Sequence, residues 1–280
     1  MSDPAADGHA VRDVGTIGIA GWGRMGREMG KALVRRGWPV IAVDPDPAAQ
    51  EGIESAGARR ADTVAEMAAG VDLVLVVVVD DDQARAAISG PSGALERIRP
   101  GTIVGVCASV RPDTCIELAR AARGREAHVI DVALVGGERG AEQAALRLMC
   151  GGSGDVVERC RRAFSAFATD VCHVGDVGSG QVAKTANNIL LWACIRADVE
   201  ALRLAKALGV DPGKLRAFLN IGSGANRPLA EWGMHRLRWP AKDLEVALGM
   251  AQEAGIDMPL VAALPELMAE LSAEDLHALR

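Results

Sequence analysis

The sequence contains no tyrosine, and aromatic residues make up only 3% of its 280 residues. Positive charge is also scarce, because 31 Lys and Arg stand against 37 Asp and Glu, which gives a formal net charge of −6. Proteins that bind nucleic acid need clustered, excess Lys and Arg to contact phosphates. This charge balance predicts that DNA and RNA are not partners.

Long hydrophobic runs are missing as well. The longest one, residues 71–79, is interrupted by Asp72, and it is far shorter than the roughly 20 apolar residues of a membrane-spanning helix. The first dozen residues carry charges and have no apolar stretch, which is unlike a signal peptide or an anchor. We therefore expect a cytoplasmic protein with no membrane contact.

Patterns of metal ligands and disulfides are also absent. The six cysteines form no CxxC pair, and several lie in apolar runs, where a thiol behaves as a small hydrophobic group. No cluster of His, Cys, Asp and Glu has the spacing of a metal site. We expect reduced, structural cysteines and no metal.

What the sequence does contain, from Val14 onward, is an alternation of short β-branched runs with amphipathic segments. This alternation is typical of βαβ units in a parallel sheet, and the continuous apolar run at 73–79 fits a strand buried on both faces. Expected strands include residues 14–21, 39–44, 73–79, 101–109, 127–134, 145–151 and 170–175. The fold class predicted is α/β, with an N-terminal Rossmann domain over residues 1–177.

Strand signals stop after Gly180. Residues 181–208 contain neither Pro nor Gly and are predicted to form one long, largely apolar helix, long enough to bridge two domains. Further helices are expected at residues 212–219, 228–237, 241–254 and 259–270. The sequence thus predicts an all-α C-terminal domain over residues 178–280. Since this domain has no sheet of its own to cover its apolar stripes, we expect a homodimer or homotetramer.

A glycine-rich turn follows the first expected strand and opens a helix. It has the pattern GxGxxG, in which the glycines permit a tight turn, approach of the backbone to a pyrophosphate and close helix packing. Asp44 ends the second strand, where a carboxylate accepts hydrogen bonds from the ribose and repels the 2′-phosphate of NADP. The pattern predicts dinucleotide binding with NAD preferred over NADP; the simpler interpretations are a plain turn and an Asp that opens the turn at residues 44–47. The cofactor-binding residues of the turn are Gly21, Trp22, Gly23, Arg24, Met25 and Gly26.

Lys184 and Asn188 are four residues apart near the start of the long helix and therefore lie on one face. An ammonium and a carboxamide side by side can hold and protonate the oxygen of a carbonyl that accepts a hydride. Such a pair taken alone is more often solvated on a helix surface.

Together these segments resemble the β-hydroxyacid dehydrogenase family, which includes 3-hydroxyisobutyrate dehydrogenases, tartronate semialdehyde reductases and, more distantly, 6-phosphogluconate dehydrogenases. The family's GxGxMG loop matches residues 21–26, its GxGxxxKxxNN signature matches residues 178–188, and its KDL element matches residues 242–244. The resemblance implies that Lys184 is the general acid and base, that Asn188 orients the reacting oxygen, and that Lys242 helps to close the site over nicotinamide and substrate.

The family's substrate-binding element, DAPVSGGxxGA, corresponds to residues 131–141, but Val135 stands where the family has serine. That serine donates a hydrogen bond to the substrate carboxylate, so the substitution puts a standard 3-hydroxy acid substrate in doubt. Backbone amides at Gly136 and Gly137 are candidate anchors for a substrate anion, because glycine lets the main chain approach closely. Ser109, where relatives commonly have Thr, keeps a hydroxyl that could contact cofactor or substrate.

Three further residues complete the predicted site. Val79, at the end of an expected strand, is assigned to the cofactor site, and Asp243, beside Lys242, to the substrate site. Trp232 is a candidate for lining the substrate pocket, although a Trp at helical spacing belongs more often to the core.

The resulting hypothesis is an NAD-dependent oxidoreductase that transfers hydride between nicotinamide and a small hydroxy acid or (semi)aldehyde. An imine reductase shares this architecture, but imine reductases generally replace the lysine at position 184 with another proton donor. A non-catalytic dinucleotide-binding scaffold is the other alternative, and the presence of Lys184, Asn188 and Lys242 argues against it.

Overall fold

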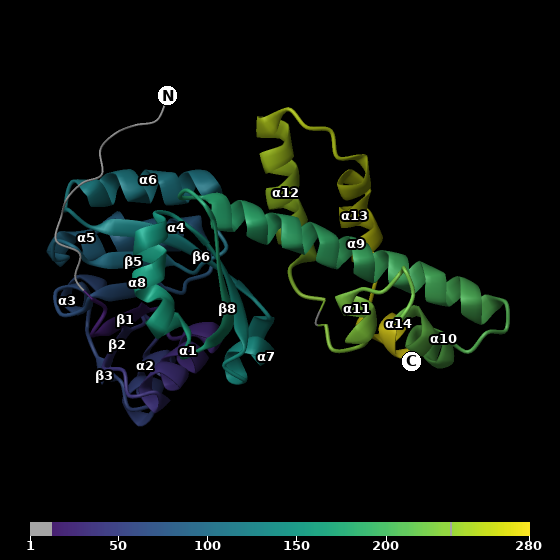
Figure 1. The fold of residues 1–280 in the computed structure, drawn as a ribbon, viewed down its shortest axis with the longest axis horizontal. Coiled ribbons are helices and arrows are strands. Elements are labelled where there is room, and N and C mark those ends of the chain that lie inside the picture. The colour runs from purple at the N-terminus through teal and green to yellow at the C-terminus, as the bar shows by residue number, and fades with distance from the viewer. Residues whose placement is uncertain (1–12, 236) are drawn as a thin grey trace. The chain divides into compact units, whose positions relative to one another are not determined.

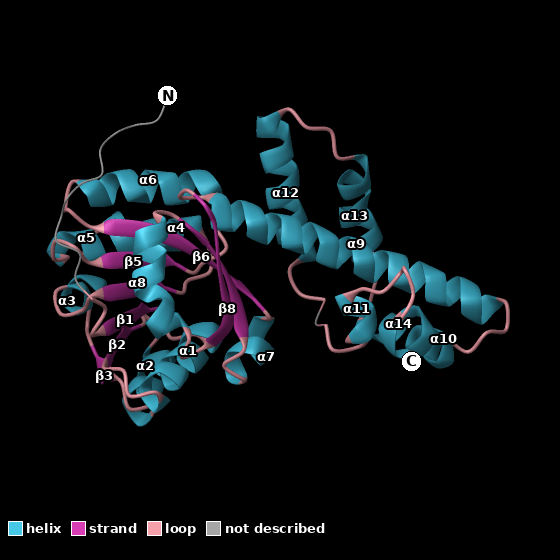
Figure 2. Ribbon diagram, viewed as in Figure 1, coloured by secondary structure: helices cyan, strands magenta, loops and turns pink. Residues whose placement is uncertain are grey.

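The computed structural model describes residues 13–235 and 237–280. In these residues helices alternate with strands as far as Gly175, and only helices follow (Figure 1; Figure 2). The chain divides into two compact units, one that ends at Lys184 and one that runs from Thr185 to Arg280. The assignment of functional domains to residues 1–177 and 178–280 stays a prediction.

The first unit is built on one sheet with the strand order β3-β2-β1-β4-β5-β6-β7-β8 among the described residues. Neighbouring strands are parallel except for the antiparallel pair β6 and β7. The first six strands in this order reproduce the arrangement of a dinucleotide-binding Rossmann sheet, which confirms the predicted fold class. The strands are β1 (Ile17–Ala20), β2 (Val40–Val43), β3 (Arg59–Arg60), β4 (Leu73–Val76), β5 (Ile103–Val106), β6 (His128–Val135), β7 (Leu146–Gly151) and β8 (Ala168–Gly175).

Helices cover both faces of this sheet (Figure 2). Because successive strand residues point to opposite faces, Leu73 and Leu75 of β4 pack into one core and Val74 and Val76 into the other. Every residue of β1, β2, β4 and β5 is buried, as expected for parallel strands between two helical layers. The helices are α1 (Arg24–Arg35), α2 (Pro47–Ser55), α3 (Val64–Ala68), α4 (Asp81–Ser89), α5 (Ala94–Arg97), α6 (Pro112–Arg123), α7 (Gly137–Glu142) and α8 (Gly154–Phe164).

The second unit is helical throughout its described residues and has a core of its own, which includes Trp192, Val199 and Leu264. The 29-residue α9 (Ser179–Ala207) starts in the first unit and continues into the second. The remaining helices are α10 (Pro212–Leu219), α11 (Arg227–Ala230), α12 (Pro240–Ala254), α13 (Pro259–Ala269) and α14 (Ala273–His277).

The helix expected at residues 228–237 is wrong in its extent. Asn226 caps the start of α11, with its side chain accepting a hydrogen bond from the N–H of Leu229, but the helix ends at Ala230. Gly233 has a φ of +76°, and backbone in this left-handed region cannot continue a right-handed helix.

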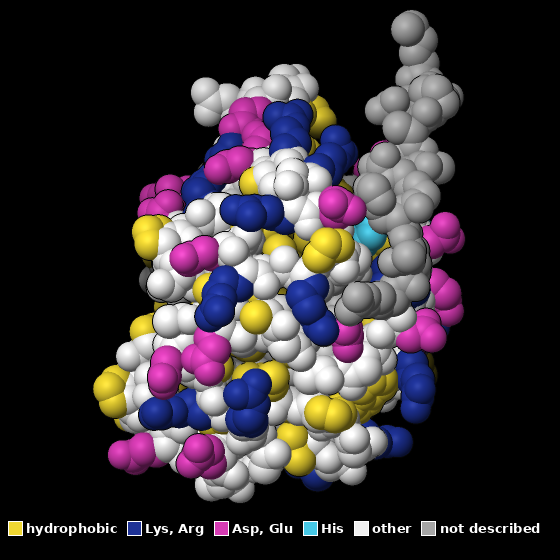
Figure 3. All heavy atoms as spheres, turned by 90° about the vertical axis from the view of Figure 1, so that its left-hand side faces the viewer, with side chains coloured by type: hydrophobic (Ala, Val, Ile, Leu, Met, Phe, Trp, Pro, Cys, Tyr) yellow, Lys and Arg dark blue, Asp and Glu magenta, His cyan; other side chains and the backbone are white. Residues whose placement is uncertain are grey.

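No helix of the described residues combines the length and the apolar character needed to cross a bilayer. On the face of the molecule drawn in Figure 3, Lys and Arg side chains lie interspersed with Asp and Glu side chains rather than in one patch.

Trp22 anchors the turn between β1 and α1 in the core. Its side chain is only 2% exposed, and it packs against two glycines in the interiors of neighbouring helices. A Cβ at Gly30 of α1 would overlap the indole ring, whereas a Cβ at Gly52 of α2 would lie at an ordinary contact distance of 3.6 Å from Nε1. The indole ring of Trp22 therefore fits into the core only because residue 30 is a glycine.

We expect Gly30→Ala to lower the free energy of unfolding by about 1–3 kcal/mol, because the added methyl group displaces the Trp22 ring from a packed core. Gly52→Ala is the matched control; it is expected to be neutral or to stabilise α2 by up to about 1 kcal/mol through helix propensity. Urea denaturation of the two variants checks the prediction, and equal stabilities would contradict it.

Candidate active site

The glycine turn lies between the end of β1 and the start of α1. Gly21 has a φ of +101°, and a Cβ there would collide with the carbonyl of Val77; a Cβ at Gly26 would collide with the carbonyl of Gly21. At the exposed Gly23, by contrast, no described atom lies within 4 Å of the position a Cβ would take. The first and third glycines thus allow close packing, and the second leaves the backbone open to a ligand.

Asp44 follows β2 directly and is held at the tip of the glycine turn. Its Oδ2 accepts a hydrogen bond from the N–H of Trp22 at 2.6 Å, and its Oδ1 accepts one from the N–H of Asp46 at 2.9 Å. The hydrogen bond from Asp46 shows that Asp44 does open the turn at residues 44–47, which was the simpler interpretation of this residue. Since each carboxylate oxygen can accept more than one hydrogen bond, the turn and the binding of a ribose are compatible.

The other side chains of the glycine turn point in different directions. Trp22 is buried, and Met25 packs against the core. Arg24 is exposed, and its Nε lies 3.0 Å from Oε1 of Glu138 in α7. This ion pair links the glycine turn to the segment that follows β6.

The loops that follow β4 and β5 lie at the same edge of the sheet, because these strands are parallel. Val79, 59% exposed, donates its N–H to Oε1 of Gln83 at 3.1 Å. Ser109 is exposed between the buried residues Ala108 and Val110. Both predicted cofactor contacts therefore lie on ordered loops at the edge where ligands of such sheets bind.

Asp131, in β6, is fully buried and fixes the start of α9. Its Oδ1 accepts a hydrogen bond from the N–H of Gly178 at 2.6 Å, and its Oδ2 accepts one from the N–H of Gln181 at 2.9 Å. Burial raises the pKa of this carboxyl group, and the hydrogen bonds from the backbone partly oppose that rise. A helix N-terminus also favours negative charge.

Lys184 lies one turn into α9. Its half-buried Nζ donates a hydrogen bond to the carbonyl oxygen of Leu134 at 2.8 Å. Directly after Leu134 come the half-buried Val135 and the exposed Gly136 and Gly137, the latter two with φ values of +116° and +59°. The first unit therefore brings the predicted lysine beside the predicted substrate loop.

The other predicted site residues belong to the second unit. Asn188 follows Lys184 by four residues on α9, is 7% exposed, and accepts a hydrogen bond from Nδ2 of Asn187 at 3.2 Å. Asp243 accepts a hydrogen bond from the indole N–H of Trp192 at 3.1 Å, next to the half-buried Lys242 in the first turn of α12.

Trp232 also belongs to the second unit, where it is part of the core. It is 9% exposed, and its indole N–H donates to the carbonyl oxygen of Leu276 at 3.0 Å. Trp232 is therefore a core residue, which was the simpler of the two interpretations of the sequence.

Two buried polar residues that sequence reasoning did not assign to the site hold it in place. Asp131 was noted only as the first residue of the substrate element. Gln181 was noted only within the helix signature, yet its side chain bonds to the loop that carries Ser109. A polar residue in an otherwise apolar strand was the available signal for Asp131, because buried charges need partners.

The buried cysteines offer no activated nucleophile. All six are free thiols and four are buried. Burial raises the pKa of Cys150 and of Cys160 to about 12, so both stay protonated at neutral pH. No group of three or more His, Cys, Asp or Glu among the residues that the structure describes is arranged to hold a metal ion.

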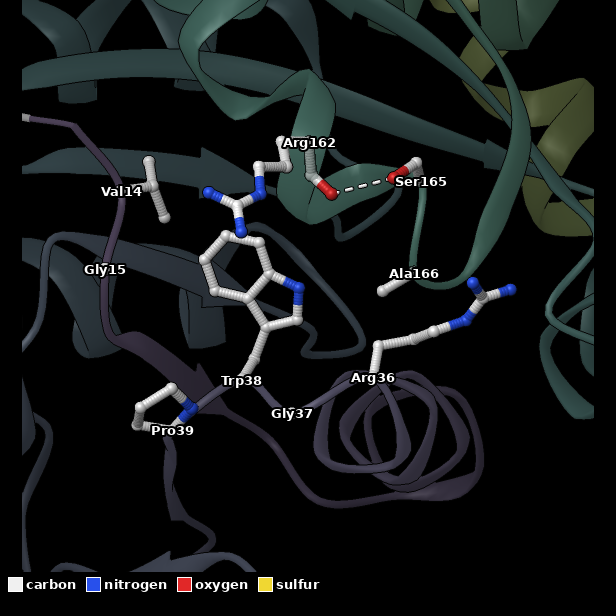
Figure 4. A pocket seen from close by; sticks show the side chains of 9 residues that line it. All are labelled: Val14, Gly15, Arg36, Gly37, Trp38, Pro39, Arg162, Ser165 and Ala166. Carbon is white, nitrogen blue, oxygen red and sulfur yellow. Dashed lines mark hydrogen bonds between the residues drawn. The ribbon is translucent and has the colours of Figure 1, made fainter.

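A pocket of about 370 Å³ lies elsewhere on the first unit (Figure 4). Its walls include residues that precede β1 and β2, whereas the glycine turn follows β1. The guanidinium carbon of Arg162 lies 5.3 Å from the centre of the Trp38 ring. Arg36 and Arg162 lie at the C-terminal ends of α1 and α8, where cations offset the helix dipole.

We expect Asp131→Asn to lower the free energy of unfolding by about 1–3 kcal/mol, because the amide NH₂ would face a backbone N–H in a buried site. The pKa of Asp131 is raised from its ordinary value of 3.8, so its contribution to stability is complete below that pH and declines as the pH rises through the folded-state pKa. The loss should therefore be larger near pH 4 than at neutral pH.

Chemical denaturation at both pH values measures the effect of Asp131→Asn. Asp82→Asn is the matched control, since the side chain of Asp82 is 98% exposed. The prediction would be wrong if the two variants were equally stable at both pH values.

Comparison with known proteins places this geometry in a family. Residues 16–175 match the family model described as the NAD binding domain of 6-phosphogluconate dehydrogenase. Residues 178–279 match the model described as the NAD-binding domain of NADP-dependent 3-hydroxyisobutyrate dehydrogenase. The two models together cover nearly all the described residues.

Individual relatives agree with the family models. An NAD-dependent L-serine dehydrogenase of Pseudomonas aeruginosa is 31% identical over 210 residues, which are 75% of this chain and 70% of that protein. A 2-(hydroxymethyl)glutarate dehydrogenase of Eubacterium barkeri is 28% identical over 257 residues, 88% of this chain and 85% of that protein.

Among solved structures, 3-hydroxyisobutyrate dehydrogenase of Mycobacterium tuberculosis with L-serine has a TM-score of 0.86 at 25% identity, covering 95% of this chain and 99% of that one. The sequence signatures, the Rossmann sheet and these matches agree: the chain belongs to the β-hydroxyacid dehydrogenase family, whose members are NAD(P)-dependent oxidoreductases that act on hydroxy acids.

Proposed function

We propose that the protein is an NAD-dependent dehydrogenase that interconverts a small hydroxy acid and its (semi)aldehyde, with Lys184 as general acid and base. The observation that carries the proposal is the hydrogen bond from Nζ of Lys184 to the carbonyl oxygen of Leu134, at 2.8 Å. It holds an ammonium group beside the exposed amides of Gly136 and Gly137.

Two observations support binding of a dinucleotide at the glycine turn. The backbone at Gly23 is open to a ligand, and the carboxylate of Asp44 retains acceptor capacity beside it. When bound, the nicotinamide group accepts or supplies the hydride. The residues that hold it are those of the turn at 21–26, Asp44 and the loops at Val79 and Ser109.

The protein's own part in the reaction is to hold the substrate and move one proton. In the direction of reduction, Lys184 donates a proton from Nζ to the carbonyl oxygen that receives the hydride; in oxidation, Nζ takes the proton from the hydroxyl group. Asn188 donates its amide N–H to the same oxygen and orients it, since a carboxamide cannot itself transfer the proton.

The preference for NAD over NADP is proposed from charge. A carboxylate at position 44 repels the 2′-phosphate of NADP and accepts from the 2′-hydroxyl of NAD. Of the two arginines on the neighbouring strand β3, Arg60 is already paired with Asp62 at 3.3 Å. The L-serine dehydrogenase relative is described as NAD-dependent.

The substrate class is proposed from the names of the relatives. L-serine, 3-hydroxyisobutyrate and 2-(hydroxymethyl)glutarate each carry a hydroxymethyl group on the carbon next to a carboxylate. In this chain the amides of Gly136 and Gly137 are the proposed anchors for such an anion, and Val135 supplies an apolar wall beside them.

A homodimer or homotetramer is part of the proposal. Among the described residues of the second unit, six large apolar side chains are each more than 60% exposed. Association of identical subunits would bury such side chains. They are Leu190, Leu204, Leu208, Phe218, Ile221 and Leu260.

Lys184→Ala is expected to lower kcat/KM for NADH-dependent reduction of short (semi)aldehydes by about 10²- to 10⁴-fold, the usual contribution of a general acid. Binding of NADH, followed by fluorescence titration, should stay intact. Lys214→Ala, which changes an exposed lysine of α10, is the matched control and should keep wild-type rates.

Full activity of Lys184→Ala would remove this lysine as the proton donor. Wild-type protein that reduces cyclic imines and ignores aldehydes would instead favour imine reductase chemistry. Tight binding of NADH without turnover of any carbonyl or imine would favour a non-catalytic scaffold.

Asp44→Asn is expected to weaken NADH binding and to reduce the preference for NADH over NADPH by about tenfold, since one charged hydrogen bond and one repulsion are lost. Asp46→Asn is the matched control, because Asn retains the acceptor that Asp46 offers to the N–H of Ala48 at the start of α2. The ratio of kcat/KM for the two cofactors measures the effect, and an unchanged ratio in Asp44→Asn would exclude the assigned role.

A further inference from the structure

Gln181 is a buried carboxamide whose donor and acceptor are both in use. The residue is 2% exposed and lies in the first turn of α9. Its Nε2 donates a hydrogen bond to the carbonyl oxygen of Ala108 at 2.9 Å, and its Oε1 accepts one from the N–H of Val110 at 3.3 Å. One side chain thus bonds to the backbone on both sides of Ser109.

This two-point contact fixes the orientation of the loop as well as its position. A single hydrogen bond would let the peptide groups around Ser109 rotate, whereas bonds to residues 108 and 110 hold both ends of the exposed residue between them. A carboxamide supplies both a donor and an acceptor, whereas an ionised carboxylate lacks the donor and a thioether lacks both strong groups.

The same helical turn is itself fixed and carries the lysine. The N–H of Gln181 donates to Oδ2 of the buried Asp131 at 2.9 Å. Lys184 is three residues further along, so the two side chains are neighbours on the helix surface. Lys184 bonds to Leu134 near the end of β6, and Gln181 bonds to the loop after β5.

The loop after β5 has a second anchor on its far side. The N–H of Arg111 donates to Oδ1 of Asp81, at the start of α4, at 2.9 Å. The loop is therefore tied at residues 108, 110 and 111, and the exposed Ser109 is the residue left to face outward.

We propose that Gln181 is a positioning residue of the reaction, which sets the place of the Ser109 hydroxyl and peptide relative to the ammonium group of Lys184. The inference rests on the proposed function, in which Lys184 moves the proton and the loop at Ser109 contacts cofactor or substrate. Gln181 acts through that loop and does not touch the reacting atoms.

The test compares Gln181→Met, Gln181→Glu, Ser109→Ala and the double variant Gln181→Met with Ser109→Ala in the full-length protein. Gln181→Met should lower kcat by about 10- to 100-fold, the scale of effect that a small displacement of reacting groups produces. The Kd for NADH should rise by a smaller factor than kcat falls, because the glycine turn and Asp44, which hold the dinucleotide as well, are unchanged. The double variant should lose no more than the larger of the two single losses, since both changes act on the same contact.

Gln181→Glu separates positioning from folding. Ionised Glu keeps the acceptor for the N–H of Val110 and the shape of the side chain but places an oxygen against the carbonyl of Ala108. At a pH where the carboxyl group is ionised, kcat should therefore fall while the folded fraction, measured by circular dichroism, stays high. Gln252→Met, at an exposed position of α12, is the matched control and should keep wild-type rates.

Three results would overturn the inference. The first is that the losses of kcat from Gln181→Met and Ser109→Ala multiply in the double variant. The second is that kcat per folded molecule equals that of wild type in both Gln181 variants. The third is that only the Kd for NADH changes. If Lys184→Ala abolishes turnover while the Gln181 variants retain it, the inference about Gln181 fails alone; if Lys184→Ala retains turnover, the proposed function fails first.

Discussion

The buried carboxylate of Asp131 is the constraint on which the site in the first unit depends. A carboxyl group enclosed in an apolar sheet is stable only when its oxygens are hydrogen-bonded, and here the backbone N–H groups of Gly178 and Gln181 at the start of α9 supply the hydrogen bonds. That requirement fixes the first turn of the helix against the middle of β6. The places of Gln181 and Lys184, and through them of the loops after β5 and β6, follow from it.

Local patterns in the sequence were enough for the fold class, although they missed the short, exposed strand β3. Strands buried on both faces leave continuous apolar runs, and the glycine turn is confined to six neighbouring residues, so the Rossmann sheet and the following helices could be predicted. The extent of α11 could not, because the apolar spacing does not show that the helix ends at Ala230, ahead of the left-handed backbone at Gly233.

The supporting residues of the site were beyond sequence reasoning for a different reason. Asp131 and Gly178 are 47 positions apart, and Gln181 and Ala108 are 73 apart, so their pairing exists only once the sheet has formed. The catalytic roles of Lys184 and Asn188 could be predicted only from the family signature. A Lys and an Asn on a helix do not by themselves indicate catalysis. For Trp232, the general tendency of large apolar side chains to be buried predicted its place in the core, and no motif was needed.

The continuous α9 also limits how this protein can change in length. An α-helix turns by about 100° for each residue, so one residue inserted or deleted between Lys184 and Asn188 would rotate the second side chain away from the face of the first. A surface loop, such as the turn after Leu208, absorbs an insertion at little cost in closure entropy. Natural or engineered length variation should therefore collect in the loops and spare the first turns of α9.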